Sequence, residues 1–262
     1  MSDIKTIGVV GAGQMGAGIA HVAAMSGYSV ILTDISEEAV AKGLAGIEKN
    51  MRRRISSLGK KLAKGQLIQE DHDSQASELE SAITIALARI STSTSLSAHA
   101  DADLVVEAAT ENVTLKNKIF AELSEVTPDR TILCSNTSSI SITSIAASTN
   151  RPDKVMGMHF MNPVPMMKLV ELIRGMATSV ATYKTVNAVA ERMGKTTVEG
   201  RDMPGFIVNR ILMPYINEAA QALYEGIASV EDIDIAMKLG TNVPMGPLAL
   251  ADFIGLDTRL AI

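Results

Sequence analysis

The sequence of 262 residues lacks most of the features that mark specialised protein classes. It has one cysteine and no tryptophan, and aromatic residues make up 3% of it. A single cysteine excludes a disulfide scaffold and a cysteine-rich zinc or iron–sulfur site. So few aromatics disfavour a surface that stacks nucleic-acid bases. No stretch reaches the roughly 18 uninterrupted apolar residues of a membrane span. We therefore expect no metal site, no nucleic-acid partner and no membrane partner.

The charge and the N-terminus point to the same broad class. The 24 Lys and Arg face 29 Asp and Glu, which gives a net charge of −5, and this balance argues against nucleic-acid binding. The composition is 47% hydrophobic and 20% charged, as in globular proteins. Residues 1–3 lead almost directly into an apolar run, so we expect no signal or transit peptide and a cytoplasmic location.

Short apolar, β-branched runs alternate with segments of helical period through the first three quarters of the chain. Most runs are continuously apolar, which is typical of strands buried on both faces. This alternation predicts an α/β fold with a doubly wound, mostly parallel sheet. The expected strands are Thr6–Val10, Ser29–Thr33, Asp103–Ala108, Thr131–Ser135, Val155–Phe160 and Lys168–Ile173, and the expected helices are Met15–Ser26, Asn112–Val126 and Tyr183–Met193.

The last quarter of the chain changes character, because strand candidates disappear after about residue 200. Helices are expected over 206–226 and 229–239, and a further one after the break at Gly246-Pro247. We predict a first domain over residues 1–200 and a smaller all-α domain over 201–262. The second is too small to close a core alone, so it should dock on the first domain or on a second subunit.

Residues 39–96 exceed what a minimal strand–helix–strand connection needs, and they predict a projecting arm of two helices around a loop at 59–75. The segment 42–64 has a charge of +7, because only Glu48 opposes its basic residues, which are Lys42, Lys49, Arg52, Arg53, Arg54, Lys60, Lys61 and Lys64. Two interpretations stay open: a solvated helix face, or a platform that holds a polyanion by charge-assisted hydrogen bonds.

The first expected strand ends in Gly11-Ala12-Gly13-Gln14-Met15-Gly16 and leads into a helix. In this context the three glycines indicate a dinucleotide site: Gly11 allows the tight turn, Gly13 lets the backbone approach a pyrophosphate, and Gly16 allows close packing of helix and strand. The next strand ends at Asp34, 18 residues past Gly16. A carboxylate there binds ribose hydroxyls and repels a 2′-phosphate, which favours NAD over NADP.

His159 ends a predicted strand, and Glu171 lies inside the next apolar run, twelve residues on. A carboxylate in a hydrophobic strand is costly unless it is paired, and His159 is the natural partner. A carboxylate-held imidazole is a competent general acid/base. The alternative, a satisfied core histidine and an unrelated glutamate, stays open. The other histidines, His21, His72 and His99, are expected to be structural or exposed.

Two further sets of polar residues have open interpretations. The segment Asn136-Thr137-Ser138-Ser139 follows a predicted strand, so it either hydrogen-bonds a substrate oxygen or caps the next helix. Asn209 lies at the edge of the apolar stripe expected for the 206–226 helix, where it can face a crevice between the domains.

Taken together, these segments resemble the 3-hydroxyacyl-CoA dehydrogenase family, and most of all its bacterial members that act on 3-hydroxybutyryl-CoA. The resemblance covers nearly the whole chain, and it rests on GAGQMGAGIAHVAA, DLVVEAATEN, SNTSSISIT, HFMNPVPMMKLVELI, DMPGFIVNRILMPYINEA and AMKLGTNVPMGPLAL. It implies a Rossmann domain followed by a helical domain that forms a homodimer, with the active site between the two domains.

The resemblance also implies roles for residues. His159 would be the general base and Glu171 its orienting partner, while Ser138 and Asn209 match substrate-binding positions. NAD contacts would come from the glycine turn with Gln14 and Met15, from Asp34 and Ser138, and from Glu111, Lys116 and Asn162. The helical arm would bind the nucleotide end of coenzyme A, for which Arg53 and Lys61 are the candidates. Family members continue past the position of Thr258, so we expect a helical domain shortened at its C-terminus.

These observations predict an NAD-dependent oxidoreductase that acts on a short-chain (3S)-3-hydroxyacyl-CoA. Two other functions stay open on the sequence alone. One is a related dehydrogenase of a free 3-hydroxy acid, which needs no basic arm. The other is a non-catalytic NAD-binding relative, although the His159 and Glu171 pair speaks against it.

Overall fold

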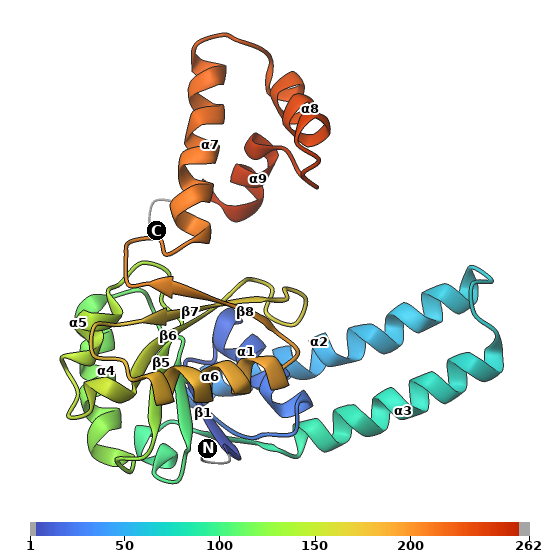
Figure 1. Ribbon diagram of the computed structural model, residues 1–262. Helices are drawn as coiled ribbons and strands as arrows, with labels where there is room; N and C mark the ends of the chain where they lie inside the picture. The colour runs from blue at the N-terminus through green and yellow to red at the C-terminus, as the bar shows by residue number, and fades with distance from the viewer. Residues whose placement is uncertain (1–3, 257–262) are drawn as a thin grey trace. The chain divides into compact units, whose positions relative to one another are not determined.

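A computed structural model describes residues 4–256. All eight of its strands lie in one sheet, in the order β3-β2-β1-β4-β5-β6-β7-β8 (Figure 1). The first six are mutually parallel in the order typical of Rossmann folds, whereas β7 runs antiparallel to β6 and β8 runs parallel to β7. The predicted doubly wound, mostly parallel sheet is therefore confirmed. The strands are β1 Thr6–Val10, β2 Ser29–Thr33, β3 Ile90–Ser93, β4 Leu104–Glu107, β5 Ile132–Ser135, β6 Val155–Phe160, β7 Leu169–Arg174 and β8 Thr196–Arg201.

The sequence analysis missed the two outermost strands, β3 and β8. Neither is a continuous apolar run: β3 reads ISTS with no fully buried residue, and in β8 Gly200 alone is buried. Both lie at the edges of the sheet. An edge strand is covered less completely than a central one, so it lacks the pattern that revealed the six strands between them.

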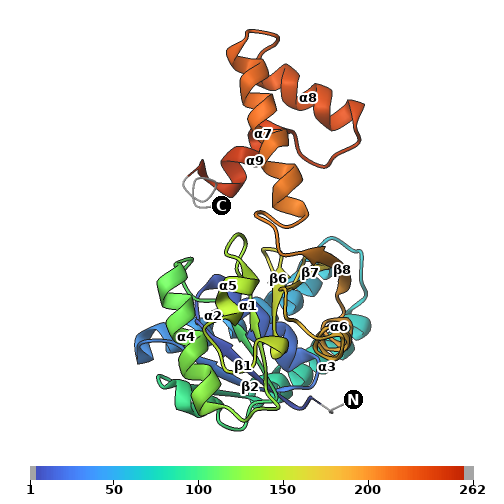
Figure 2. The same cartoon turned by 60° about the vertical axis from the view of Figure 1, so that its left-hand side comes forward.

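Helices pack on both faces of the sheet. Helix α1 (Gln14–Met25) contributes to the same buried cluster as α6 (Val180–Arg192), whereas α4 (Val113–Val126) and α5 (Ile142–Ala146) pack together elsewhere. Figure 2 shows α4 on one side of the sheet and α6 on the other. In open α/β sheets of this kind, ligands bind at the carboxyl ends of the parallel strands.

The arm consists of two long antiparallel helices, α2 (Glu37–Ala63) and α3 (Gln69–Leu87) (Figure 1). The expected loop over 59–75 is too wide, because α2 continues to Ala63 and α3 begins at Gln69. The reversal is made around Gly65, whose φ of +67° suits glycine. Ile47 and Met51 of α2 and Ile83 of α3 are buried, so the base of the arm belongs to the main core.

The basic helix of the arm lies beside an acidic one. Helix α3 carries five carboxylates, and it packs along the basic helix α2. Arg52 pairs with Glu48 at 2.9 Å on its own helix, and it also donates a hydrogen bond to Glu80 of α3. The charge of +7 holds for segment 42–64, and in the folded arm α3 neutralises part of this basic face.

The chain divides into two compact units, of which the first ends at Asp202 and the second begins at Met203. The second contains α7 (Val208–Tyr224), α8 (Val230–Gly240) and α9 (Pro247–Ile254), and both α7 and α8 contact α9. Asp234 of α8 accepts hydrogen bonds from Leu248 N at 2.8 Å and from Ala249 N at 2.9 Å, which ties α9 to α8. Within residues 4–256, no helix has the length and apolar character needed to cross a bilayer.

His99 is a structural histidine, as expected, but it lies in a 3-10 turn (Leu96–His99) and is fully buried. Its Nε2 donates to Thr33 Oγ1 at 3.0 Å, because that hydroxyl itself donates to Val9 O. A Cβ on Gly8 would lie 2.4 Å from Nδ1, so glycine at position 8 makes room for the ring. Burial lowers the pKa of His99 from 6.5 to about 4.

This buried neutral ring predicts a loss of stability in acid. Unfolded chains protonate His99 below pH 6.5, whereas the folded protein does not do so until about pH 4. The free energy of unfolding should therefore fall as the pH drops through this range, by up to about 3 kcal/mol. His99→Gln keeps a donor near the Nε2 position but cannot titrate, so urea unfolding at pH 7 and pH 4 should show a smaller loss in this variant. An equal loss in both proteins would contradict the prediction.

Candidate active site

The glycine turn between β1 and α1 has the geometry of a dinucleotide cradle. Gly11 has φ +99°, and a Cβ there would lie 2.6 Å from Ala108 O. A Cβ on Gly16 would lie 1.7 Å from Gly11 O, so the helix packs directly on the turn. A Cβ on Gly13 meets nothing within 4 Å, which leaves space in front of the backbone at the N-terminus of α1. The first turn of that helix has no acidic residue, so its partial positive charge is available to an anion.

Asp34 lies at the end of β2 beside this turn. Its Oδ2 accepts a hydrogen bond from Ala12 N at 2.6 Å, and its Oδ1 accepts one from Ile35 N at 2.7 Å. A cavity of about 400 Å³ is lined by Gly11, Gly13 and Asp34 together with residues of α4 and the loop after β4. The open backbone at Gly13 and the carboxylate at the far end fit a dinucleotide such as NAD.

His159 and Glu171 are cross-strand neighbours. The loop over residues 161–168 reverses the chain, so that β7 pairs antiparallel with β6 and Glu171 stands opposite His159. Glu171 is fully buried and His159 nearly so. The His159 Nδ1 atom lies 2.7 Å from Glu171 Oε2. Antiparallel register thus brings together two residues that are twelve positions apart.

These contacts assign the two nitrogens of the ring. A carboxylate only accepts, so Nδ1–H donates to Glu171, and Nε2 presents its lone pair to Ser138 Oγ at 3.0 Å. An oxygen that approaches Nε2 also meets the Ser138 hydroxyl. This arrangement suits proton exchange with a substrate hydroxyl group.

The segment after β5 does not cap the helix that follows it. The cap of α5 is Ser141, whose Oγ accepts from Ser144 N at 3.2 Å. Asn136 instead accepts from Phe160 N at 2.9 Å, which ties the segment to β6 beside His159. The Ser138 side chain is thereby left to face the imidazole.

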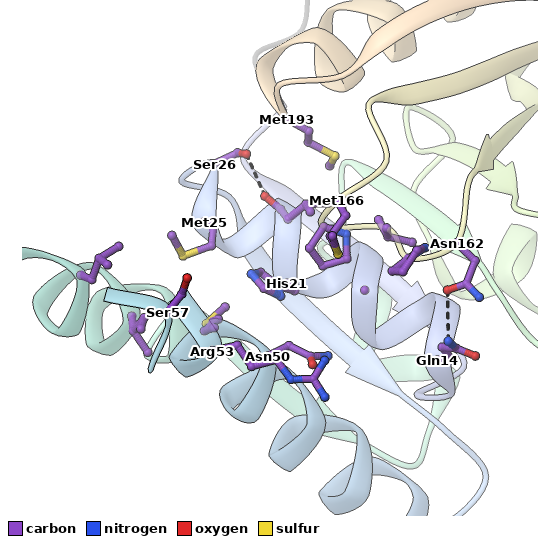
Figure 3. A pocket seen from close by; sticks show the side chains of 18 residues that line it. Gln14, His21, Met25, Ser26, Asn50, Arg53, Ser57, Asn162, Met166 and Met193 are labelled. Carbon is purple, nitrogen blue, oxygen red and sulfur yellow. Dashed lines mark hydrogen bonds between the residues drawn. The ribbon is translucent and has the colours of Figure 1, made fainter. Parts of the chain in front are cut away.

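Glu111 supports the same segment from the loop after β4. It accepts hydrogen bonds from Thr137 Oγ1 and from Ser138 N, the latter at 3.0 Å. Burial opposes its ionisation, but the Thr137 hydrogen bond and the charge of Lys116 hold the pKa of Glu111 below its ordinary value. Lys116 itself is buried, and its Nζ lies 3.3 Å from Glu111 Oε2. Nearby, Gln14 Nε2 donates to Asn162 Oδ1 at 3.1 Å (Figure 3).

The two arm residues singled out from the sequence lie in different hollows. Arg53 lines a cavity of about 770 Å³ between α1, the arm and the loop over residues 161–168 (Figure 3). Lys61 lines a cavity of about 540 Å³ between α2 and α3. His21 of α1 also lines the first cavity. Asn209 lies in α7 of the second unit.

The methionines around His159 divide into two groups. Met156 and Met158 of β6 are buried core residues, whereas Met166 lines the cavity that contains Arg53.

Residues 4–256 contain no group of three or more His, Cys, Asp or Glu side chains placed to hold a metal ion.

Comparison with known proteins assigns the two units. Residues 6–203 match the 3-hydroxyacyl-CoA dehydrogenase NAD binding domain, and residues 205–262 match the C-terminal domain of the same enzymes. The chain belongs to the 3-hydroxyacyl-CoA dehydrogenase family. The resemblance stated from the sequence is thus confirmed, and with it the expectation of NAD as cofactor.

Members of this dehydrogenase family with similar sequences come from several bacteria. A 3-hydroxybutyryl-CoA dehydrogenase of Bradyrhizobium diazoefficiens is 51% identical over 259 residues, which are 99% of this chain and 82% of the relative. One of Clostridioides difficile is 46% identical over 98% of this chain and 85% of its own length. The crystal structure of (S)-3-hydroxybutyryl-CoA dehydrogenase PaaH1 from Ralstonia eutropha has a TM-score of 0.85 at 49% identity, covering 99% of this chain and 85% of that one.

The position of Asp34 predicts cofactor preference. Asp34→Ser removes the carboxylate that we expect to bind ribose hydroxyls and to repel a 2′-phosphate. The ratio of the NADPH Kd to the NADH Kd should fall about tenfold or more, which corresponds to about 1.4 kcal/mol. Fluorescence titration of both cofactors measures this ratio, with Asp101→Ser at an exposed position as the matched control. A ratio unchanged by Asp34→Ser would contradict the assignment.

Proposed function

We propose that this dehydrogenase transfers a hydride between the C3 hydroxyl of a short-chain (3S)-3-hydroxyacyl-CoA and NAD, with 3-hydroxybutyryl-CoA and acetoacetyl-CoA as its substrate pair. The observation that carries the proposal is the Glu171–His159–Ser138 series, with contacts of 2.7 Å and 3.0 Å and with Glu171 and His159 buried. The relatives of similar sequence named 3-hydroxybutyryl-CoA dehydrogenase support the choice of substrate.

In this mechanism the protein moves the proton. His159 Nε2 takes the proton of the C3 hydroxyl, and the hydrogen bond from Nδ1 to Glu171 orients the ring and stabilises its cation. The Ser138 hydroxyl polarises the C3 oxygen. The glycine turn and Asp34 would hold NAD, which would supply the acceptor for the hydride of C3. In the reverse direction His159 returns the proton to the oxygen of the ketone.

The remaining roles follow the family pattern. Asn209 would hold the substrate from the second unit. We assign cofactor contacts to a larger set of residues in the first unit, which are Gly11, Gly13, Gln14, Met15, Gly16, Asp34, Glu111, Lys116, Ser138 and Asn162. The space at Gly13 and the Asp34 cavity support this set.

We further assign the nucleotide end of coenzyme A to the arm, with Arg53 and Lys61 as anionic contacts. Both side chains are exposed on α2 and line hollows large enough for parts of a ligand. Charge-assisted hydrogen bonds from such residues hold phosphate groups. A free 3-hydroxy acid has no phosphate, so the arm separates the two substrate classes.

We also propose a cytoplasmic homodimer formed through the helical unit. Apolar side chains are exposed on all three of its helices, among them Ile211, Ile235, Leu239 and Phe253. Surfaces of this kind mark protein–protein contacts. Sedimentation equilibrium should give about twice the 27.7 kDa of one chain, and a value of one chain would contradict the dimer. Cell fractionation tests the compartment.

Substitution of the general base tests the proposed chemistry. NADH oxidation by acetoacetyl-CoA should be saturable, and His159→Gln should lower kcat by about 10²–10⁴-fold, because general-base catalysis contributes that much. His72→Gln on the arm makes the same change away from the site and should have no such effect. A loss of less than about threefold in His159→Gln would show that another group moves the proton.

Neutralising the arm tests the substrate class. In Arg53→Gln/Lys61→Gln the KM for acetoacetyl-CoA should rise about tenfold, because two phosphate contacts are lost, while the NADH Kd stays within twofold. The KM for free acetoacetate, if it reacts at all, should not change. An unchanged KM for acetoacetyl-CoA would favour the dehydrogenase of a free acid, and NADH binding without any turnover would favour the non-catalytic relative.

A further inference from the structure

Lys195 is a buried cation that the mechanism above does not use. It lies just after α6, and 8% of its surface is exposed. Its Nζ donates to two main-chain carbonyls of the loop over residues 161–168, to Val164 O at 2.5 Å and to Met167 O at 2.8 Å. Both acceptors are neutral, and burial lowers the pKa of the ammonium. A buried ammonium needs hydrogen bonds to replace water, so the lysine and the loop hold each other.

The end of α6 fixes the main chain of Lys195. Gly194 follows the helix with φ +72°, and the amide of Lys195 donates to Ala190 O at 3.1 Å, a hydrogen bond typical of helix C-termini. The next residue, Thr196, begins β8 and donates its amide to Lys168 O at 2.8 Å. A cation at this end of a helix is also favoured by the helix dipole. The side chain therefore reaches the loop from a fixed point.

The loop over residues 161–168 also contacts α1. Val164 is buried, and a Cβ built on Gly18 would lie 2.8 Å from the Cβ of Val164, so the loop is seated directly on the helix. Asn162 accepts a hydrogen bond from Gln14 Nε2 at 3.1 Å, where α1 leaves the glycine turn (Figure 3). Lys195 and α1 together thus determine where the loop lies.

The same loop forms one wall of the cavity that contains Arg53 (Figure 3). Met193, two residues before Lys195, lines this cavity as well. The loop contributes Asn162, Pro163, Val164, Pro165 and Met166 to the lining, opposite residues of the arm. The position of the loop therefore sets the width of the space in which we place part of coenzyme A.

The catalytic pair is held in another way. His159 and Glu171 lie within β6 and β7, and the antiparallel ladder of these strands joins five residue pairs. The hydrogen bonds of Lys195 are not part of this ladder, so their loss leaves the two side chains opposite each other. We therefore expect ligand binding and proton transfer to respond separately to a change at Lys195.

We propose that Lys195 is a positioning residue for ligand binding: its ammonium holds the loop over residues 161–168 on α1, which keeps Asn162 at the glycine turn and sets one wall of the coenzyme A cavity. Lys195 acts through the loop and leaves proton transfer at His159 unchanged. The part of this proposal that concerns acyl-CoA rests on the proposed function, whereas the part that concerns the position of the loop does not.

Substitution of the lysine separates binding from catalysis. In Lys195→Met the KM for acetoacetyl-CoA should rise about tenfold and the NADH Kd about fivefold, because the loop loses two hydrogen bonds from a charged donor. The kcat at saturating substrate should stay within about threefold. Lys195→Arg keeps a charged donor and should recover most of both losses.

Three results at this position would overturn the proposal. A KM and a Kd within twofold of the wild type in Lys195→Met would mean that Lys195 serves stability alone. A fall in kcat as large as the fall in kcat/KM would mean that it acts on the chemical step. Equal losses in Lys195→Arg and Lys195→Met would mean that hydrogen-bond donation by the side chain is not the cause.

A substitution in α1 moves the loop without touching the lysine. Gly18→Ala places a Cβ 2.8 Å from that of Val164, so the loop must shift, although alanine itself favours the helix. The KM for acetoacetyl-CoA should rise with little change in kcat, as in Lys195→Met. Gly240→Ala is the matched control, because this exposed helical glycine has nothing within 4 Å of an added Cβ. A KM unchanged by Gly18→Ala would contradict the role of the loop.

Hydrogen exchange reports the position of the loop in the absence of ligands. In Lys195→Met the amides of residues 161–168 should exchange at least about tenfold faster than in the wild type, as followed by mass spectrometry. Lys184→Met makes the same change on the exposed face of α6 and should leave the exchange rates and the kinetic constants within twofold. Unchanged exchange in Lys195→Met would show that the lysine does not hold the loop.

Two further measurements keep the outcomes distinct. Circular dichroism establishes that each variant is folded, and Gly18→Ala tests the role of the loop if Lys195→Met does not fold. If the wild type fails to oxidise NADH with acetoacetyl-CoA, the proposed function is wrong. The exchange rates and the NADH Kd then still decide whether Lys195 positions the loop.

Discussion

The antiparallel pairing of β6 with β7 is the constraint on which the active site depends. It is the one reversal of direction in an otherwise parallel run of strands, and it sets Glu171 directly against His159 inside the sheet. The loop that makes the reversal is itself tied down, because the buried Lys195 donates to Val164 O at 2.5 Å and to Met167 O at 2.8 Å. A buried carboxylate at Glu171 is tolerated because this register gives it a partner, and the same partner needs the carboxylate to fix its ring.

The parallel strands supply the rest of the site, because their carboxyl ends meet along one edge of the sheet. The edge gathers the glycine turn after β1, Asp34 after β2, Glu107 and Glu111 at the end of β4 and beyond it, and the Ser138 segment after β5. Most of the hydrogen bonds that position these groups join neighbouring strands. The groups around the imidazole are thus held in place by contacts between neighbouring strands.

The sequence was most informative where burial is continuous and the motifs are long. The six central strands, the glycine turn and the His159 and Glu171 pair could be predicted because each follows from apolar runs or from a charge within one. The edge strands β3 and β8 could not, since half-exposed strands lose that signal. Nor could the pairing of Arg52 with Glu80 or the burial of Lys116, because both depend on which helix packs against which neighbour. The local hydrophobic pattern predicts helices and strands, whereas tertiary packing decides which residues the charged side chains pair with.

The central claim is that Glu171 acts only by orienting and supporting the His159 imidazole. The most direct test is the first-turnover rate of NADH oxidation at saturating acetoacetyl-CoA, measured in His159→Gln, Glu171→Gln and the double variant. Glu171→Gln alone should slow this rate, because the ring loses its orientation and the support of its cation. In the His159→Gln background the same change should have no further effect beyond about twofold, since nothing remains for Glu171 to orient. Losses that multiply in the double variant would contradict the pairing as the basis of catalysis.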